Sequence, residues 1–408
     1  MAVGNDNLPE LLPVAGVRVG TASAGIKTPG RKDLVLFELA AGTHCAGVFT
    51  QNAFCAAPVT VAQRNLADCD GQPTYWLVNT GNANAGTGEA GIAAAEACID
   101  AVAAATSTRA AQVLPFSTGV IGEPLPVDRI VEAIPDVVSR LRPEGWAEAG
   151  EGILTTDTRP KGASVQFEFD GKTYTVSGIA KGAGMIRPNM ATMLAYLATD
   201  AAVEVDALRA MLSGATQRSF NRITIDGDTS TNDACVLAAT GAAGNDFVTS
   251  IDSPLAIALS DAVEQVCVEL AQGLVRDGEG ASKFVSVKVE QGRHEQECLE
   301  VAFTIAHSPL VKTALFASDP NWGRILAAIG RADIDDLVVE DVSVFLGDTL
   351  IAENGCRASS YTEEQGVAAM EPEELEIRVV LNRGDAEATV WTTDFSYDYV
   401  KINAEYRT

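Results

Sequence analysis

A threonine preceded by a glycine-rich turn and two cationic side chains is the part of this sequence best suited to chemistry. The stretch KGAGMIRPNMATMLAYLATD (181–200) begins with Lys181, passes through Arg187-Pro188, and reaches Thr192 just before an apolar run. Paired glycines let backbone and ligand approach closely, and proline fixes its own φ and favours an extended residue before it. Thr192 therefore stands where an irregular segment enters a buried element, which is a suitable place for a nucleophile.

A threonine hydroxyl is a weak nucleophile unless a base lies beside it. One solution is cleavage of the preceding peptide bond, because the α-amine of the threonine then serves as the base. In this chain the cut would fall between Ala191 and Thr192. The alternative is that the glycines and the proline only shape a loop around an ordinary buried threonine. Because short motifs often match by chance, this stretch alone favours the alternative.

Two other segments carry residue types that an acyl-transfer site needs. In Ser117-Thr118-Gly119 the glycine leaves backbone N–H groups free to point at a ligand, as an oxyanion hole requires. Glu279 stands between Gly278 and Gly280, where a carboxylate could bind an ammonium group or transfer a proton. Taken alone, the first segment is more often a plain turn and the second more often an exposed loop acid.

Composition limits the function classes. The chain has 408 residues, 47% of them hydrophobic, which predicts a large core divided into two or three units. Acidic residues outnumber basic ones, and the formal charge of −26 argues against nucleic-acid binding. No apolar run is long enough for a membrane helix and no secretory signal is evident, so we expect a soluble, cytoplasmic protein. Eight scattered cysteines and three separated histidines argue against a metal site and a disulfide framework.

Strands and helices alternate along the chain, which predicts layered α/β packing. Helices are expected at 91–105, at 127–141 with an interruption at Pro135, from an Asp206 cap to about 219, and from Ser253-Pro254 to about 271. Strands are expected at 34–37, 46–49, 75–78, 284–289 and 338–346, together with a hairpin over 164–177 that turns at Asp170-Gly171. Two further strands, 375–381 and 388–392, are compatible with a second hairpin.

One acidic segment, DGDTSTND (226–233), superficially suggests a calcium loop. It lacks the spacing to a closing glutamate that an EF-hand requires, so we predict a structural or interface turn.

The stretch KGAGMIRPNMATML (181–194) resembles the signature of the ornithine acetyltransferase (ArgJ) family of arginine biosynthesis. Further matching segments lie in the family's order: GVFTQNAFCAAPV (47–59), VNTGNANAGTG (78–88), STGVIG (117–122), TTDTRPK (155–161), FNRITIDGDTSTND (220–233), DGEGASKF (277–284), SDPNWGRI (318–325) and KINAEYRT (401–408). The resemblance therefore covers nearly the whole chain.

This resemblance implies an α/β fold in which sandwiched β-sheets are covered by helices. It also implies a precursor that cleaves itself into two interlocked subunits, 1–191 and 192–408, which we expect as a heterotetramer of two of each. The implied reaction moves an acetyl group from N2-acetyl-L-ornithine to L-glutamate through an acetyl-threonine intermediate. Some family members also take acetyl from acetyl-CoA. No cofactor and no metal is implied.

The resemblance also implies the site residues. Thr192 is the nucleophile, Thr118 and Gly119 form the oxyanion hole, and Asn403 and Thr408 contact the substrate. One threonine of the 155–161 segment contacts the substrate too, either Thr155 or Thr156. From charge we assign Lys181 to a substrate carboxylate and Glu279 to an amine or to proton transfer.

Two other function classes remain open. A self-cleaving aminopeptidase or amidohydrolase with an N-terminal nucleophile would use water to discharge the acyl-enzyme. A catalytically inactive binding or scaffold protein is the other class, and the intact set of Lys181, Thr192 and Glu279 argues against it.

Overall fold

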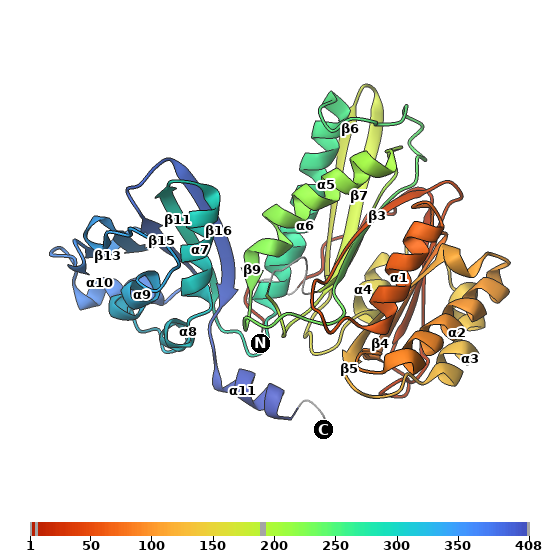
Figure 1. Cartoon of the computed structure of the whole chain (residues 1–408), viewed down its shortest axis with the longest axis horizontal. Helices are drawn as coiled ribbons and strands as arrows, with labels where there is room; N and C mark the ends of the chain where they lie inside the picture. Colours follow the sequence, from red (N-terminus) through yellow and green to blue (C-terminus); the bar gives the residue numbers. More distant parts are fainter. Residues whose placement is uncertain (1, 5–6, 188–192, 406–408) are drawn as a thin grey trace.

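The computed structural model describes residues 2–4, 7–187 and 193–405, and all structural statements below refer to them. The chain forms a mixed α/β structure with three sheets. Two sheets stack in an N-terminal sandwich, and the third forms a C-terminal unit beside it (Figure 1). The predicted α/β class is confirmed, and helices pack on both sheets of the sandwich.

The first sheet of the sandwich has the strand order β1-β2-β4-β5. Its strands are β1 (Val17–Ala22), β2 (Leu34–Leu39), β4 (Tyr75–Asn82) and β5 (Val113–Val120). The parallel pair β4 and β5 is joined through the crossover helix α2 (Gly88–Thr106), as parallel strands require. Helices α2 and α3 (Val127–Ser139) cover the outer face of this sheet, beside α1 (Ala57–Asp68).

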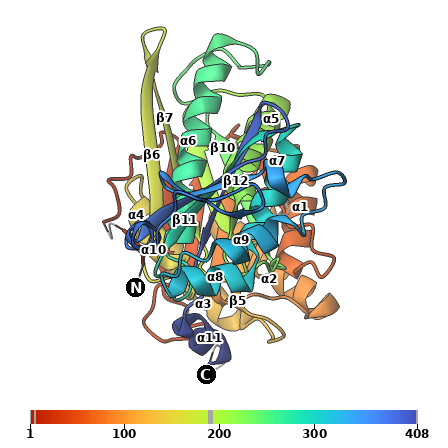
Figure 2. The same cartoon turned by 90° about the vertical axis from the view of Figure 1, so that its left-hand side faces the viewer.

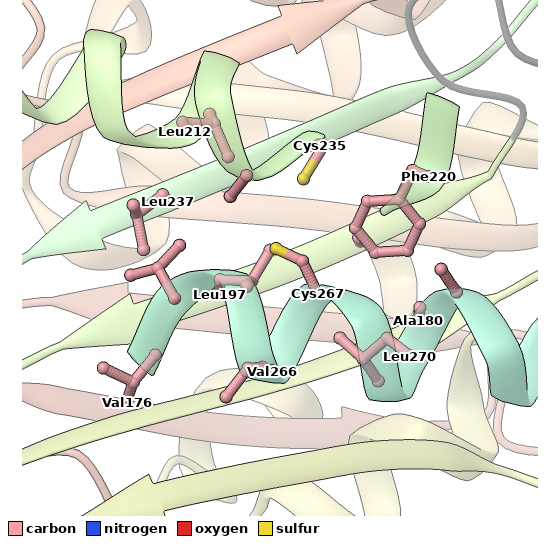
Figure 3. Close-up of a cluster of buried hydrophobic side chains, with 14 of the residues drawn as sticks. Val176, Ala180, Leu197, Leu212, Phe220, Cys235, Leu237, Val266, Cys267 and Leu270 are labelled. Atoms are coloured by element: carbon pink, nitrogen blue, oxygen red, sulfur yellow. The ribbon is translucent and has the colours of Figure 1, made fainter. Parts of the chain in front are cut away.

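The second sheet has the order β3-β10-β8-β7-β6. Its strands are β3 (His44–Phe49), β10 (Ala234–Ala239), β8 (Leu194–Thr199), β7 (Lys172–Lys181) and β6 (Lys161–Phe169). Helices α5 (Val205–Arg218) and α6 (Pro254–Arg276) cover its outer face, where Leu212 of α5 and Cys267 of α6 pack over Leu197 (Figure 3).

The space between the two sheets is filled mainly by aromatic and small apolar side chains. The Phe37 ring stacks on the Tyr196 ring with centroids 5.2 Å apart, and Trp76 and Trp146 complete the cluster. Trp146 begins the short helix α4 (Trp146–Gly152). Both sheets are therefore buried on two faces, which accounts for their nearly continuous apolar runs.

The C-terminal unit is built on a seven-stranded sheet in the order β14-β13-β12-β15-β11-β16-β9. Its strands are β9 (Ile223–Thr224), β11 (Phe284–Gly292), β12 (Ser343–Leu346), β13 (Thr349–Glu353), β14 (Cys356–Arg357), β15 (Glu374–Val380) and β16 (Ala386–Thr393). Helices α7 (Glu295–Ala306), α8 (Pro309–Phe316), α9 (Trp322–Ile329) and α10 (Glu363–Met370) pack with it. The last helix, α11 (Tyr397–Ala404), extends away from this unit below the sheet (Figures 1 and 2).

Several predicted elements are confirmed. The hairpin turns at Asp170 and Gly171, which both have positive φ as a tight two-residue hairpin turn requires. Helix α6 starts after Ser253, whose hydroxyl accepts a hydrogen bond from the Ala256 N–H at 3.3 Å.

Other predictions were wrong. Helix α3 continues through Pro135, because burial of Ile130, Ile134 and Val137 on one face offsets the lost backbone hydrogen bond. Helix α5 has Glu204 at its N-cap position, without a side-chain capping hydrogen bond, and Asp206 lies in its first turn. The expected strand 338–346 is shorter than predicted, because Val339–Asp341 forms a 3₁₀ turn and only Ser343–Leu346 (β12) is a strand.

The second proposed hairpin was also wrong. Strands β15 and β16 do not pair with each other, because β11 lies between them, parallel to β15 and antiparallel to β16. Within the described residues, no helix is long and apolar enough to cross a membrane.

Candidate active site

A cavity of about 270 Å³ lies where one end of the first sheet faces one end of the second. The first sheet contributes Ala83 and residues 118–121, and the second contributes Lys181 and the loops at 183–185 and 230–232. Thr155, Thr156, Glu279 and Asn403 complete the lining. The seven predicted site residues that the structure describes all line this cavity: Thr118, Gly119, Thr155, Thr156, Lys181, Glu279 and Asn403.

Three predicted residues cannot be compared with the cavity in this way. Ala191 and Thr192, at the expected cleavage point, lie outside the described residues, and so does Thr408.

The corner at Thr118-Gly119 forms a rigid wall of the cavity at the end of β5. Gly119 has φ +134, and a Cβ atom there would lie 2.2 Å from the backbone carbon of Gly81, so only glycine fits. The Asn232 side chain donates hydrogen bonds to the carbonyls of Ser117 at 2.9 Å and Ala83 at 2.6 Å. This corner is therefore tied to the second sheet, as a preorganised oxyanion hole would need to be.

Lys181 ends β7 and lines the opposite wall, where it is partly exposed to the cavity. Burial lowers the pKa of its ammonium group, while the nearby carboxylates of Asp157, Asp233 and Glu279 act in the opposite direction. No described residue accepts a hydrogen bond from this ammonium group. Lys181 is therefore a cation that can bind a ligand carboxylate without breaking an existing bond.

A buried ion network behind Lys181 was not predicted from the sequence. The Lys161 ammonium contacts the carboxylates of Asp157 and Asp277, the latter at 2.5 Å. Burial alone would raise the pKa of Asp157, but the ammonium groups of Lys161 and Lys181 and the Gly182 N–H hold it well below its usual range. The three residues occur in the matching segments TTDTRPK and DGEGASKF, which was the only sequence signal for them.

Glu279 is held at the cavity by close packing with a glycine loop. Its N–H donates to the Ala183 carbonyl at 2.7 Å, and a Cβ atom on Gly184 would lie 2.5 Å from its carboxylate oxygen. The Asn403 side chain donates to this carboxylate at 2.7 Å. Glu279 is therefore a buried acid, not the exposed loop acid that the sequence left as the alternative.

Asp226 fixes the other end of the same glycine loop. Its carboxylate accepts the backbone N–H groups of Met185 at 2.6 Å and Ile186 at 2.9 Å, and burial raises its pKa. The prediction of a structural turn at 226–233 is therefore confirmed. This turn also presents residues 230–232 to the cavity.

The two threonines of the 155–161 segment are not distinguished by the cavity, since both line it. Thr155 is tied to Asp157, whose carboxylate accepts its N–H at 3.0 Å.

The comparisons with known proteins agree with one another. The ArgJ family model matches residues 18–408. The arginine biosynthesis bifunctional protein ArgJ of Pseudomonas fluorescens is 58% identical over 408 residues, with both chains covered in full. The protein of the same name from Methylococcus capsulatus is 54% identical over 398 residues, which cover 98% of this chain and 97% of the relative.

Among solved structures, the chain is similar to an ornithine acetyltransferase complexed with ornithine from Mycobacterium tuberculosis. The identity is 37%, the match covers 45% of this chain and 98% of that chain, and the TM-score is 0.39.

Proposed function

The chain belongs to the ArgJ family and is an acetyltransferase of arginine biosynthesis, and we propose that Thr192 carries its acetyl group. In this proposal the enzyme transfers acetyl from N2-acetyl-L-ornithine to L-glutamate. The observation that carries it is a cavity in which a glycine corner, a lysine ammonium group with no hydrogen bond to a described residue and a buried carboxylate come together.

The neighbours of Thr192 support its assignment as the nucleophile. Leu194 pairs with Lys181 across β7 and β8, and the Met193 carbonyl accepts the Ala234 N–H at 3.0 Å. Thr192 directly precedes Met193 in the sequence. Cleavage of the Ala191–Thr192 bond would give the threonine an α-amine that acts as its base.

The reaction then has two halves. The Thr192 hydroxyl attacks the acetyl carbonyl, its proton passes to the α-amine, and the ornithine amine leaves with that proton. The glutamate amine attacks the resulting ester and releases N-acetylglutamate. Thr118 and Gly119 stabilise the oxyanion in both halves, and loss of one such donor typically costs roughly a hundredfold in rate.

The charges of the cavity suit an amino-acid substrate. Lys181 is assigned to the substrate carboxylate, and Glu279, held by Asn403, to an amine or to proton transfer. Thr155 or Thr156, and Thr408, would supply further polar contacts.

The sheet order also bears on the proposed subunits, 1–191 and 192–408. Strand β8 follows the cleavage point but lies between β7, which precedes it, and β10, which follows it. Strand β3, from before the cut, pairs with the other edge of β10. After cleavage the two chains would therefore remain interlocked in one sheet. A cytoplasmic heterotetramer of two chains of each kind remains part of the proposal.

Intact-mass spectrometry of the wild-type protein beside Thr192→Ala tests this proposal. We expect two wild-type chains divided at Ala191–Thr192 and one uncut, inactive chain in the variant. An uncut wild-type protein would leave Thr192 without its base and would overturn the mechanism.

Transfer assays then separate the remaining function classes. An acetyl-enzyme predicts ping-pong kinetics with acetylornithine and glutamate. Release of free acetate without any need for glutamate would indicate a hydrolase, and a compulsory ternary complex would exclude the acetyl-threonine route.

A further inference from the structure

The first cavity, the one at the candidate active site, carries charges that suit one substrate better than the other. Among its described lining residues, Lys181 is the only cation and Glu279 the only carboxylate. The α-nitrogen of acetylornithine is acylated and therefore neutral, so its side-chain ammonium is the positive charge that Glu279 can bind. Glutamate carries a carboxylate at the same number of bonds from its α-carbon. Once Lys181 holds the α-carboxylate, this second carboxylate would meet Glu279, and like charges repel.

A second cavity, of about 300 Å³, adjoins the first one and is lined by cations. The two cavities share a wall formed by Gly119, Val120, Thr155 and Thr156. The far side of the second cavity is lined by Lys27, Thr28 and Arg31 from the β1–β2 loop and by Ile402 and Glu405 from the α11 region. A substrate side chain that starts in the first cavity can therefore reach Lys27 and Arg31 by passing this wall.

The β1–β2 loop that carries these cations is held in place by a buried carboxylate. Asp33, only 2% exposed, accepts hydrogen bonds from the N–H groups of Ala24 and Ile26, both at 2.6 Å. Because a buried acid costs free energy unless it is hydrogen-bonded, these bonds favour one loop conformation. The loop is thus a built part of the site and not a loose surface turn.

The same loop is also tied to the wall between the cavities. The Arg31 guanidinium donates to the carbonyl of Leu154, which directly precedes Thr155. Gly81, with φ +103, packs against Lys27, since a Cβ atom on it would lie 3.1 Å from the Lys27 Cβ. Gly81 in turn pairs with Gly119 across β4 and β5. The backbone that carries Lys27 and Arg31 is therefore held beside the shared wall.

The charge of the second cavity differs from that of the whole chain. The formal net charge is −26, yet two cations and one carboxylate line this cavity. A general negative field repels anions, so an anionic substrate group needs local cations of this kind. The second cavity thus offers a glutamate side chain the charge that the first cavity, with Glu279, does not.

We propose that Lys27 and Arg31 bind the side-chain carboxylate of the glutamate acceptor, whereas Glu279 binds the side-chain ammonium of ornithine. This inference rests on the proposed function, because both amino acids exchange the acetyl group with the same Thr192. The two side chains are directed into different cavities, while their α-nitrogens share one position beside Gly119. One threonine can in this way serve a cationic donor and an anionic acceptor.

Two isotope-exchange reactions of the cleaved enzyme test the two amino acids separately. An acetyl-enzyme exchanges acetyl between acetylornithine and labelled ornithine without glutamate, and between acetylglutamate and labelled glutamate without ornithine. The variants are Lys27→Ala and Arg31→Ala. In each, the KM for glutamate should rise roughly tenfold or more, the size of one charge-assisted hydrogen bond. Ornithine exchange should stay unchanged, which also shows that the variants are folded.

A neutral acceptor and a control variant sharpen this test. Glutamine has the shape of glutamate without the side-chain charge, so the preference for glutamate over glutamine, as a ratio of kcat/KM, should fall by the same factor in both variants. The rise in KM should shrink at high salt. The matched control is Lys32→Ala, which removes a cation of the same loop that pairs with Glu151 outside both cavities. It should keep the wild-type KM for glutamate.

Other results would overturn the proposal. An equal loss in both exchanges would make Arg31, through its bond to the Leu154 carbonyl, a support of the shared wall and not a ligand of glutamate. An unchanged KM for glutamate would exclude the carboxylate contact, and an equal rise in Lys32→Ala would reduce the effect to general charge. These results leave the proposed function intact, whereas a wild-type enzyme without ornithine exchange would refute the acetyl-threonine itself.

Discussion

The lysine that lines the cavity of the sandwich and two buried lysines of the C-terminal unit are held in different ways. In the C-terminal unit the Lys283 ammonium donates to the carbonyls of Met370, Glu371 and Pro372 at 2.9–3.2 Å. Lys312 there donates to the Thr392 hydroxyl at 2.8 Å and to the Thr393 carbonyl. In the sandwich, Lys181 faces the cavity and donates no hydrogen bond to a described residue.

This difference separates a structural charge from a functional one. Removing a cation from water costs free energy, and the C-terminal unit recovers that cost through hydrogen bonds within the fold. At Lys181 only the charges of Asp157, Asp233 and Glu279 offset this cost, and a ligand carboxylate can supply the missing hydrogen bonds, as is typical of binding sites. The C-terminal unit does contribute to the cavity, but through Asn403, which extends from it on α11.

The largest expected effect is at the Thr118-Gly119 corner, the proposed oxyanion hole. Gly119→Ala places a Cβ atom against the Gly81 backbone, so the corner must move, and acetyl transfer should fall at least roughly a hundredfold. The matched control is Gly347→Ala in the C-terminal unit, where φ is +54 but the space is open. That variant should keep its activity and lose only about 1 kcal/mol of stability. Full activity in Gly119→Ala would contradict the oxyanion assignment.

The contrast between the lysines can be tested directly with methionine substitutions. Lys181→Met should lower kcat/KM roughly tenfold to a hundredfold. It should lower the free energy of unfolding less than Lys283→Met does, because it breaks no hydrogen bond to a described residue and removes only the charge attraction to Asp157, Asp233 and Glu279. Lys283→Met should lower the free energy of unfolding by about 1–3 kcal/mol, because it leaves buried carbonyls unpaired. Its activity per folded molecule should stay unchanged. Urea titrations and transfer assays on both variants measure these effects. A loss of stability in Lys181→Met together with a loss of activity in Lys283→Met would contradict the proposed difference between the two lysines.

A smaller effect is expected where the C-terminal unit reaches the cavity. Asn403→Ala removes the hydrogen bond to Glu279, and kcat/KM should fall by about tenfold or less. Val400→Ala, on the exposed part of the same helix, is the control for a general change in α11. Equal losses in the two variants would mean that the helix, and not the Asn403 contact, matters.

A separate prediction concerns the dependence of stability on pH. Burial lowers the pKa of Lys312 to about 7, against the opposing charges of Asp394 and Asp226. In the unfolded chain the pKa of a lysine is about 10.4. Between pH 7 and about 10.4 the unfolded state therefore binds more protons than the folded state. The free energy of unfolding should therefore rise with pH from about 7 to about 10, by at most about 1.4 kcal/mol per pH unit.

In Lys312→Met the free energy of unfolding should no longer show this rise with pH. Any pH dependence due to other groups should be the same in wild type and variant. Urea midpoints at pH 7, 8 and 9 measure it, and identical slopes in wild type and variant would contradict the lowered pKa.

Local residue chemistry determined the parts that were predicted correctly. Asp170-Gly171 specifies its turn and Ser253-Pro254 starts its helix, because both effects act within a few residues. The candidate site residues also came from local motifs, and the seven that the structure describes line one cavity.

Tertiary structure alone decided what depends on contacts between distant segments. No local pattern reports that β11 separates β15 from β16, because strand neighbours are chosen by pairing and burial over the whole sheet. In the same way, the contact of Lys161 with Asp277 joins groups 116 positions apart, and only folding brings them together. The sequence by itself thus determined which residue types are candidates for acetyl transfer, whereas packing of the two sheets decided that the seven described candidates line one cavity.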